Sequence, residues 1–313
     1  MNKTEIREFI QSNRTKGKPL SIKSINAYVS TLTNLYKNIF GDIPFDVNAF
    51  NDYATILNFM KDITYNLRKS KLSAILTVAT DEKAINEYKK LLIKDATKYD
   101  KEQDKNLFTE QQKKVHLPQD AIHDIGAGLK TEFDTLLKDI TNGTKKYGAY
   151  AYNDLQKYIL YLLTSGEYLE PRRLLEWTEL TIGKINKSTE GIADYNIYDP
   201  RKGKMMFSTY KTSEPFGVQI FDIPKHVKSY LNKWIKINNI SDGGFLFNTI
   251  KGEKLTPHLL STRLKNIYGA SVNMLRHSYI SSKYENVPTV EAITETATKM
   301  GHGLKTHLKY MKK

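Results

Sequence analysis

The spacing of apolar residues changes along the chain, and this change constrains the fold more than any other feature of the sequence. Up to about residue 100, apolar residues recur every three to four positions, as between Ile22 and Ile39, which is typical of helices with one buried face. A β-rich stretch with turn residues follows between residues 180 and 223, and helical spacing then returns. We therefore expect a mainly α fold with a small antiparallel β-sheet, of the α+β class.

The same change predicts two domains, as does a length of 313 residues. Residues 1–100 are expected to form a helical bundle and residues 119–313 a second domain. The segment 101–118 is highly charged and lacks clear periodicity, so it is predicted to be a linker; a solvated extension of the preceding helix is the alternative. The predicted helices are 4–11, 21–40, 51–67, 69–79, 81–99, 120–140, 152–163, one starting near Pro171, 224–238, 256–268, 271–284, 289–300 and 305–311. The predicted strands are 180–185, 194–198, 204–210 and 217–223.

Charge and composition limit the classes of binding partner and of chemistry that this chain can have. The chain has 48 basic and 34 acidic residues, a net charge of +14, which favours a polyanion such as nucleic acid. Only eight of the basic residues are arginine, so an AT-rich genome is an alternative source of the lysines. The lack of cysteine excludes disulfides, thiol nucleophiles and thiolate-bound metals. No long uncharged apolar run or secretory signal is found, so we expect no membrane span and an intracellular location.

Four short motifs in the second domain carry reactive side chains. In chain order they are Arg172-Arg173-Leu174-Leu175-Glu176, Lys211-Thr212, Asn273-Met274-Leu275-Arg276-His277, and Met300-Gly301-His302 followed by Tyr310. Two arginines can hold a phosphate from two sides, and a lysine on a hairpin can protonate a leaving alkoxide. A histidine adds a hydrogen bond, and a tyrosine is a competent covalent nucleophile. Together these groups suit phosphodiester transesterification without a metal.

Each motif also has a structural interpretation. Arg173 and Glu176 have the spacing of a surface ion pair, Lys211 is one of 40 lysines, and Arg276-His277 suits a cationic helix face. However, three of only eight arginines lie within two of these motifs. Their order along the chain favours a shared site.

In this order the motifs resemble those of the tyrosine recombinase (phage integrase, λ-integrase-like) family. Its members typically show Arg-x-x-Glu, a hairpin Lys, His-x-Leu-Arg-His, Leu-Gly-His and a downstream Tyr. The resemblance covers residues 119–313 as the catalytic domain, and residues 1–100 are similar to the family's core-binding domain in position and composition. It implies a clamp around double-stranded DNA, self-assembly as a dimer or tetramer on DNA, and no metal or nucleotide cofactor.

The resemblance also implies roles for individual residues. Tyr310 would attack a scissile phosphate to form a 3′-phosphotyrosyl link, Arg173 and Arg276 would hold the nonbridging oxygens with support from His302, and Lys211 would protonate the 5′-oxygen. Asn273 stands where the family has its first histidine. Arg172 competes with Arg173, which is preferred because Glu176 then has the usual offset.

Two further features depart from the family pattern. His277 is a possible auxiliary residue, expected on a different side of its helix from Arg276. Only three residues follow Tyr310, so tail docking between subunits is expected to differ.

The leading hypothesis is a site-specific DNA recombinase or integrase of a virus, phage or other mobile element. It would act in the cytoplasm or nucleoid of a host, or in the nucleus or viral factory for a eukaryotic virus. The alternatives are a type IB DNA topoisomerase, which uses the same tyrosine chemistry as a monomer, and a catalytically silent DNA-binding relative. A metal-dependent nuclease is disfavoured because we find no paired carboxylates near a histidine at ligand spacing.

Overall fold

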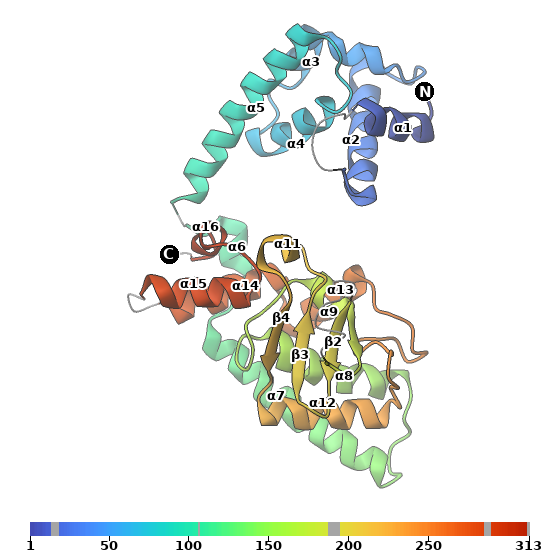
Figure 1. The fold of residues 1–313 in the computed structure, drawn as a ribbon, viewed down its shortest axis with the longest axis vertical. Helices are drawn as coiled ribbons and strands as arrows, with labels where there is room; N and C mark the ends of the chain where they lie inside the picture. Colours follow the sequence, from blue (N-terminus) through green and yellow to red (C-terminus); the bar gives the residue numbers. More distant parts are fainter. Residues whose placement is uncertain (14–18, 106, 187–194, 285–288, 312–313) are drawn as a thin grey trace. The chain divides into compact units, whose positions relative to one another are not determined.

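A computed structural model describes residues 1–13, 19–105, 107–186, 195–284 and 289–311 (Figure 1). The chain divides into two compact units, Met1–Lys105 and Asn106–Lys313. Most described residues are helical, and a four-stranded sheet lies in the second unit, which confirms the predicted fold class. Among the described residues, no helix has the length and apolar character needed to cross a bilayer.

The first unit is a helical bundle. Its elements are α1 (Lys3–Asn13), α2 (Ile22–Phe40), a 3-10 helix η1 (Val47–Asn51), α3 (Tyr53–Phe59), α4 (Tyr65–Ile75) and α5 (Glu82–Gln103). Side chains cap several N-termini: Ser21 accepts from the backbone N–H of Ser24, and Asp81 from that of Ala84. The apolar residues at helical spacing in α2 from Ile25 to Tyr36 are buried in the core of this unit, where α2 packs against α1 and α4, as amphipathic spacing requires, whereas Ile22 at the start of the helix is exposed.

One predicted helix of this unit is wrong. Residues 51–67 do not form a single helix, because α3 ends at Phe59 and α4 begins only at Tyr65. The Arg68 side chain fixes this break, since its Nη1 donates to the carbonyl oxygens of Lys61 and Ile63. The same guanidinium pairs with buried Asp95 of α5 at 2.7 Å through both Nε and Nη2.

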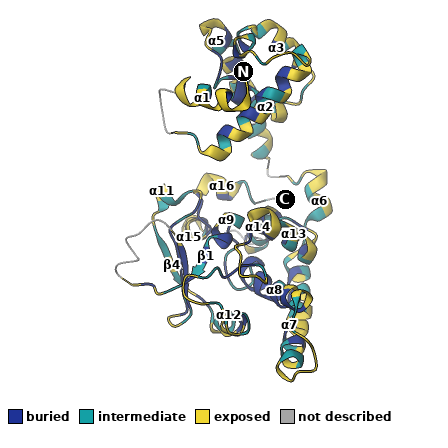
Figure 2. Ribbon diagram, turned by 90° about the vertical axis from the view of Figure 1, so that its right-hand side faces the viewer, coloured by how far each residue is buried: buried dark blue, intermediate teal, exposed yellow. Residues whose placement is uncertain are grey.

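The second unit surrounds a small sheet with helices. Its helices are α6 (Glu110–Val115), α7 (Gln119–Thr141), α8 (Ala149–Thr164), α9 (Leu174–Thr178), α11 (Ser213–Phe216), α12 (Lys225–Ile237), α13 (Pro257–Tyr268), α14 (Val272–Lys283), α15 (Val290–Lys299) and α16 (Leu304–Leu308). Helix α8 packs against α7, α12 and α13 and is buried over most of its length (Figure 2). It is the central helix of this unit's core.

The sheet has the strand order β1 (Leu180–Ile182), β2 (Asn196–Asp199), β3 (Lys204–Phe207) and β4 (Gln219–Asp222). The pairs β2–β3 and β3–β4 are antiparallel, as predicted, but β1 runs parallel to β2. A parallel pair cannot be joined by a tight turn, so β1 and β2 do not form the hairpin that an antiparallel sheet would allow. Part of the predicted strand 194–198, at residue 194, lies outside the described residues.

Two other predictions differ from the structure. The helix predicted to start near Pro171 begins at Leu174, because Arg173 is extended, with φ −76° and ψ 158°. The segment 101–118 is more structured than a linker. Residues 101–103 extend α5, as the alternative proposed, while Phe108 and Val115 pack against the core of the second unit.

Candidate active site

Four segments of the second unit bring the predicted residues together: the turn before α9, the β3–β4 connection, helix α14, and the chain from the end of α15 through α16. They bear Arg172, Arg173, Arg276, His277, His302 and Tyr310, which hydrogen bonds and ring contacts link into one cluster. Arg172, Arg276 and His302 are almost completely buried. Buried charged side chains are rare unless they are paired or functional.

Arg172 forms a structural ion pair. Its Nε donates to Glu176, a fully buried carboxylate, and its Nη1 donates to Gln219 Oε1 at 2.7 Å and to the carbonyl oxygen of Lys299 at 2.6 Å. The guanidinium also lies 4.3 Å from the ring centroid of Phe207. These contacts join α9, β3, β4 and the end of α15, so Arg172 holds the site together.

Arg173 is the more accessible of the two adjacent arginines. Its side chain is 20% exposed, against 1% for Arg172. Its Nη1 donates to the carbonyl oxygen of Gly301 at 3.1 Å and lies 4.0 Å from Glu176 Oε1. The hydrogen-bonded partner of Glu176 is therefore Arg172. The contact between Arg173 and Glu176 is longer, and it is made to a buried carboxylate rather than at the surface, as the ion-pair interpretation had it.

Arg276 begins a chain of hydrogen bonds through two histidines. Its Nη1 donates to the carbonyl oxygen of Pro171 at 2.9 Å, and its Nη2 donates to His302 Nδ1. The other nitrogen of His302, Nε2, lies 2.8 Å from His307 Nδ1. His307 is fully buried, and its ring meets that of Tyr284 edge-to-face at 5.4 Å.

Burial and positive charge keep both histidines neutral. Burial is the main cause that lowers the pKa of His302, to about 2, and the nearby guanidinium of Arg276 is the next. Burial likewise lowers the pKa of His307, to about 4. Because Arg276 can only donate, the neutral His302 ring must accept at Nδ1 and carry its proton on Nε2.

Tyr310 is half-buried, and its ring contacts both Arg276 and His302. The ring stacks on His302 with centroids 5.4 Å apart and planes at 17°. The Arg276 guanidinium lies 4.9 Å from the Tyr310 ring centroid. The predicted nucleophile is thus packed against two of the predicted phosphate-binding residues.

His277 contacts the same tyrosine as its neighbour Arg276. It was expected on a different side of α14 from Arg276, yet both side chains contact Tyr310. The His277 ring lies 4.7 Å from the Tyr310 ring, and its Nδ1 donates to the Tyr310 carbonyl oxygen at 2.9 Å. Tyr310, which follows the short helix α16, is therefore contacted by two consecutive residues of α14.

Lys211 lies in the connection between the antiparallel strands β3 and β4, as predicted. It is exposed, but its two neighbours are anchored. Thr212 donates to the carbonyl oxygen of Gly301, and the Tyr210 ring centroid is 5.1 Å from Arg172 Cζ. The backbone of Lys211 is therefore tied to the segment that carries His302.

Gly301 is required at this junction. Its φ is +66°, which side-chain-bearing residues rarely adopt. A Cβ atom there would also come within 3.2 Å of Arg172 Nη2 and 3.3 Å of the Tyr210 ring. The Gly-His pair of the fourth motif is thus explained by backbone conformation and close packing.

Asn273, like the exposed Lys211 side chain, is a predicted site residue with no side-chain contact described to the cluster. It is exposed in the first turn of α14, one turn before His277, and none of the contacts described for the cluster includes it. Conversely, His307 belongs to the cluster and was not singled out from the sequence, and Thr212, named in the second motif, was given no role there. The only available signal was that His307 lies between His302 and Tyr310.

The electrostatic character of the site is strongly positive. Burial lowers the pKa of Arg276, and the charge of Arg173 lowers it further. Arg172, Arg173 and Arg276 all act to lower the pKa of His302, so three guanidinium groups share this region with the buried carboxylate of Glu176. Such an arrangement suits a bound phosphate.

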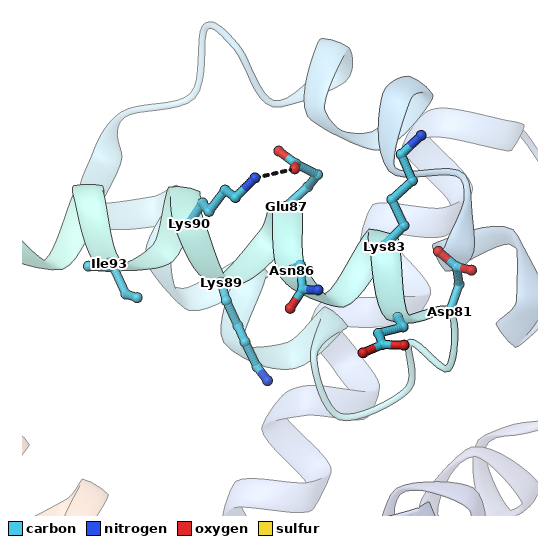
Figure 3. Close-up of a pocket in the computed structure, with 8 residues that line it drawn as sticks. Asp81, Lys83, Asn86, Glu87, Lys89, Lys90 and Ile93 are labelled. Carbon is cyan, nitrogen blue, oxygen red and sulfur yellow. Dashed lines mark hydrogen bonds and ion pairs between the residues drawn. The ribbon is translucent and has the colours of Figure 1, made fainter.

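Other features of the described residues differ from this site. We find no group of three or more His, Asp or Glu side chains there that is arranged to hold a metal ion. Figure 3 shows a pocket along α5 of the first unit, lined by acidic and basic side chains in equal number, with Lys90 paired to Glu87 at 2.6 Å. The acidic and basic side chains of this pocket point in different directions, so they do not converge on one point as the side chains of the arginine cluster do.

A comparison with solved structures finds similarity to the Tn1549 transposon integrase, solved in complex with transposon right end DNA. The two chains are 14% identical, the similarity covers 99% of this chain and 94% of that chain, and the TM-score is 0.42. No protein-family model matches the chain, and no curated protein matches it. What the site can do must therefore follow from this chain's own side chains.

Proposed function

We propose that the protein is a site-specific DNA recombinase or integrase that cuts and rejoins DNA through a 3′-phosphotyrosyl intermediate. The observation that supports this most strongly is the packing of the Tyr310 ring against Arg276 and His302, while Arg173 donates to the carbonyl oxygen of Gly301, the neighbour of His302. A nucleophilic side chain next to converging guanidinium groups is the arrangement that phosphoryl transfer requires, since the reacting phosphate gains charge-assisted hydrogen bonds.

In the proposed reaction, the Tyr310 hydroxyl gives its proton to solvent water as its oxygen attacks the scissile phosphorus, and the bond from phosphorus to the 5′-oxygen breaks. Arg173 and Arg276 hold the nonbridging oxygens and stabilise their charge in the transition state. Lys211, carried on the β3–β4 connection, gives its proton to the departing 5′-oxygen. The 5′-hydroxyl of a partner strand then attacks the phosphotyrosine, which restores the phosphodiester and frees Tyr310.

The proposed substrate is double-stranded DNA, which the protein would bind as a dimer or tetramer inside the cell that carries the mobile element. The net charge of +14 supports a polyanion, because lysines that neutralise phosphates release counterions and give salt-dependent affinity. We propose that residues 1–100 supply part of this grip and that residues 119–313 carry the chemistry.

A nicked suicide duplex tests the proposal. The short 5′-hydroxyl fragment diffuses away after cleavage, so a covalent protein–DNA adduct should accumulate in EDTA with the wild-type protein and not with Tyr310→Phe. Equal adduct with Tyr310→Phe, or none with the wild-type protein on any duplex, would refute the proposed chemistry. Relaxation of any supercoiled plasmid without a site requirement would instead favour a type IB topoisomerase. Recombination between two specific sites, through a Holliday junction, would favour the recombinase.

A further inference from the structure

The described contacts leave His302 without a free ring nitrogen. Its Nδ1 accepts from Arg276 Nη2, and its Nε2 lies 2.8 Å from His307 Nδ1. In this arrangement His302 acts on the reaction through Arg276, and His307 supports at Nε2 the tautomer that Arg276 requires at Nδ1. We propose that His307 is a positioning residue: it accepts the Nε2–H of His302 and thereby keeps the Nδ1 lone pair of His302 directed at Arg276. This role rests on the strand-transfer function proposed above.

The fold makes this hydrogen-bond chain rigid. His302 follows Gly301 at the end of α15, and His307 lies in α16, so the turn between the two helices sets the distance between the rings. Both side chains are at most 1% exposed, which keeps water from competing for either nitrogen. The two ring centroids are 5.0 Å apart.

Packing alone does not account for a histidine at position 307. Its Nε2 is buried and has no hydrogen-bond partner among the described residues. A buried N–H without an acceptor destabilises the fold, and an apolar side chain of similar size would avoid this cost. The nitrogen of His307 that is satisfied is the one that faces His302.

Besides His302, the positioned group, Arg276, is oriented by the Tyr310 ring and by one backbone carbonyl. Its Nη1 is bonded to the carbonyl oxygen of Pro171, while its Nε is buried and has no hydrogen-bond partner among the described residues. Loss of the acceptor at His302 Nδ1 would remove the bond at Nη2 and give the guanidinium more freedom to turn against the Tyr310 ring. A misplacement of this kind at the reacting phosphate can reduce a rate by about a hundredfold.

Two substitutions separate positioning from packing. His307→Leu fills the space but offers no acceptor, whereas His307→Asn retains an acceptor close to the position of Nδ1. His226→Leu is the matched control, because His226 in α12 also bonds through a ring nitrogen, to Tyr158 at 2.9 Å, but lies outside the cluster. Urea unfolding of each variant verifies that it is folded.

The first readout is the single-turnover rate of adduct formation on the suicide duplex, with DNA affinity measured in parallel. We expect His307→Leu to slow the reaction by about tenfold or more, His307→Asn to restore most of the rate, and His226→Leu to leave it unchanged, all with unaltered affinity. A wild-type rate for His307→Leu, or the same loss for His307→Asn as for His307→Leu, would overturn the positioning role.

The second readout needs no DNA. Ring ¹⁵N chemical shifts of His302 in the free protein should show a protonated Nε2 and an unprotonated Nδ1 in the wild type and in His307→Asn. In His307→Leu Arg276 still donates to Nδ1, but the buried Nε2–H of His302 has no acceptor, so the population of this tautomer should fall. An unchanged His302 tautomer in His307→Leu would contradict the inference even if the protein cleaves DNA. Absence of any wild-type adduct would instead refute the proposed function, and the ¹⁵N shifts would still decide whether His307 fixes His302.

Discussion

The His277 side chain contacts both the backbone and the ring of Tyr310. The Nδ1 of His277 donates to the Tyr310 carbonyl oxygen at 2.9 Å, and the two rings lie 4.7 Å apart. Helix α14 thus anchors the proposed nucleophile, which follows the short helix α16 near the end of the described chain. The same helix supplies Arg276, so one rigid element positions both the tyrosine and a phosphate-binding arginine.

This anchor predicts the effect of His277→Phe. Phenylalanine retains the ring contact but cannot donate to the Tyr310 carbonyl oxygen, and loss of one such hydrogen bond corresponds to about a tenfold decrease in rate. We expect slower adduct formation with unchanged DNA affinity. A wild-type single-turnover rate for His277→Phe would show that the carbonyl contact does not position Tyr310.

Substitution by alanine should mainly affect stability at Arg172 and mainly affect the reaction rate at Arg173. Arg172→Ala leaves Glu176 buried without its ion-pair partner, which should reduce the free energy of unfolding by about 3–5 kcal/mol. Arg173→Ala should cost only about 1 kcal/mol, the loss of one hydrogen bond. It should nevertheless slow adduct formation by about a thousandfold. Urea unfolding and the suicide-duplex assay measure the two quantities. An Arg173→Ala variant less stable than Arg172→Ala would reverse the roles of the two arginines.

Lys211→Ala should slow cleavage of an ordinary phosphodiester, because the 5′-oxygen then leaves without a proton donor. A 5′-bridging phosphorothiolate has a better leaving group and should restore the rate to near the wild-type value. Lys251→Ala, which alters an exposed lysine of another turn, is the control and should affect neither substrate. If the phosphorothiolate fails to rescue Lys211→Ala, Lys211 is not the general acid.

The stability of the second unit should decrease as the pH falls below 6.5. His302 and His307 have folded-state pKa values lowered to about 2 and about 4, so below pH 6.5 the unfolded chain takes up protons that the folded protein does not bind. As the pH falls, each histidine should then lower the free energy of unfolding by about 1.4 kcal/mol per pH unit until its folded-state pKa is approached. The stability that the two neutral histidines contribute is fully present above pH 6.5.

Urea unfolding at pH 7 and pH 5 measures the effect. The double variant His302→Gln/His307→Leu lacks both groups, so its free energy of unfolding should change less between the two pH values than that of the wild type. An equal change in both proteins would mean that the two histidines are charged in the folded state.

Much of the site could be predicted because its residues lie in short local motifs with recognisable spacing. The proximity of Arg276, His302 and Tyr310 follows the order of the motifs, and the β3–β4 hairpin follows from strand and turn residues. The choice between Arg172 and Arg173 could not be derived as readily. Neighbouring residues in an extended segment point to opposite sides, and the sequence does not reveal which side is buried.

Contacts that depend on the tertiary structure were not predictable. The bond between His302 and His307 crosses the turn from α15 to α16, and five residues of separation match no helical face. Thr212 reaches Gly301 across 89 positions. The parallel pairing of β1 with β2 is likewise not determined by the local sequence of either strand.

The most direct test of the proposed chemistry identifies the amino acid that becomes linked to DNA. The adduct from a suicide duplex is digested with nuclease and protease, and the peptide that retains a nucleotide is sequenced by mass spectrometry. The chain has 20 tyrosines, and we predict that the nucleotide is on Tyr310 alone, joined through its 3′-phosphate. A nucleotide on any other residue, or attachment through a 5′-phosphate, would contradict the proposed chemistry.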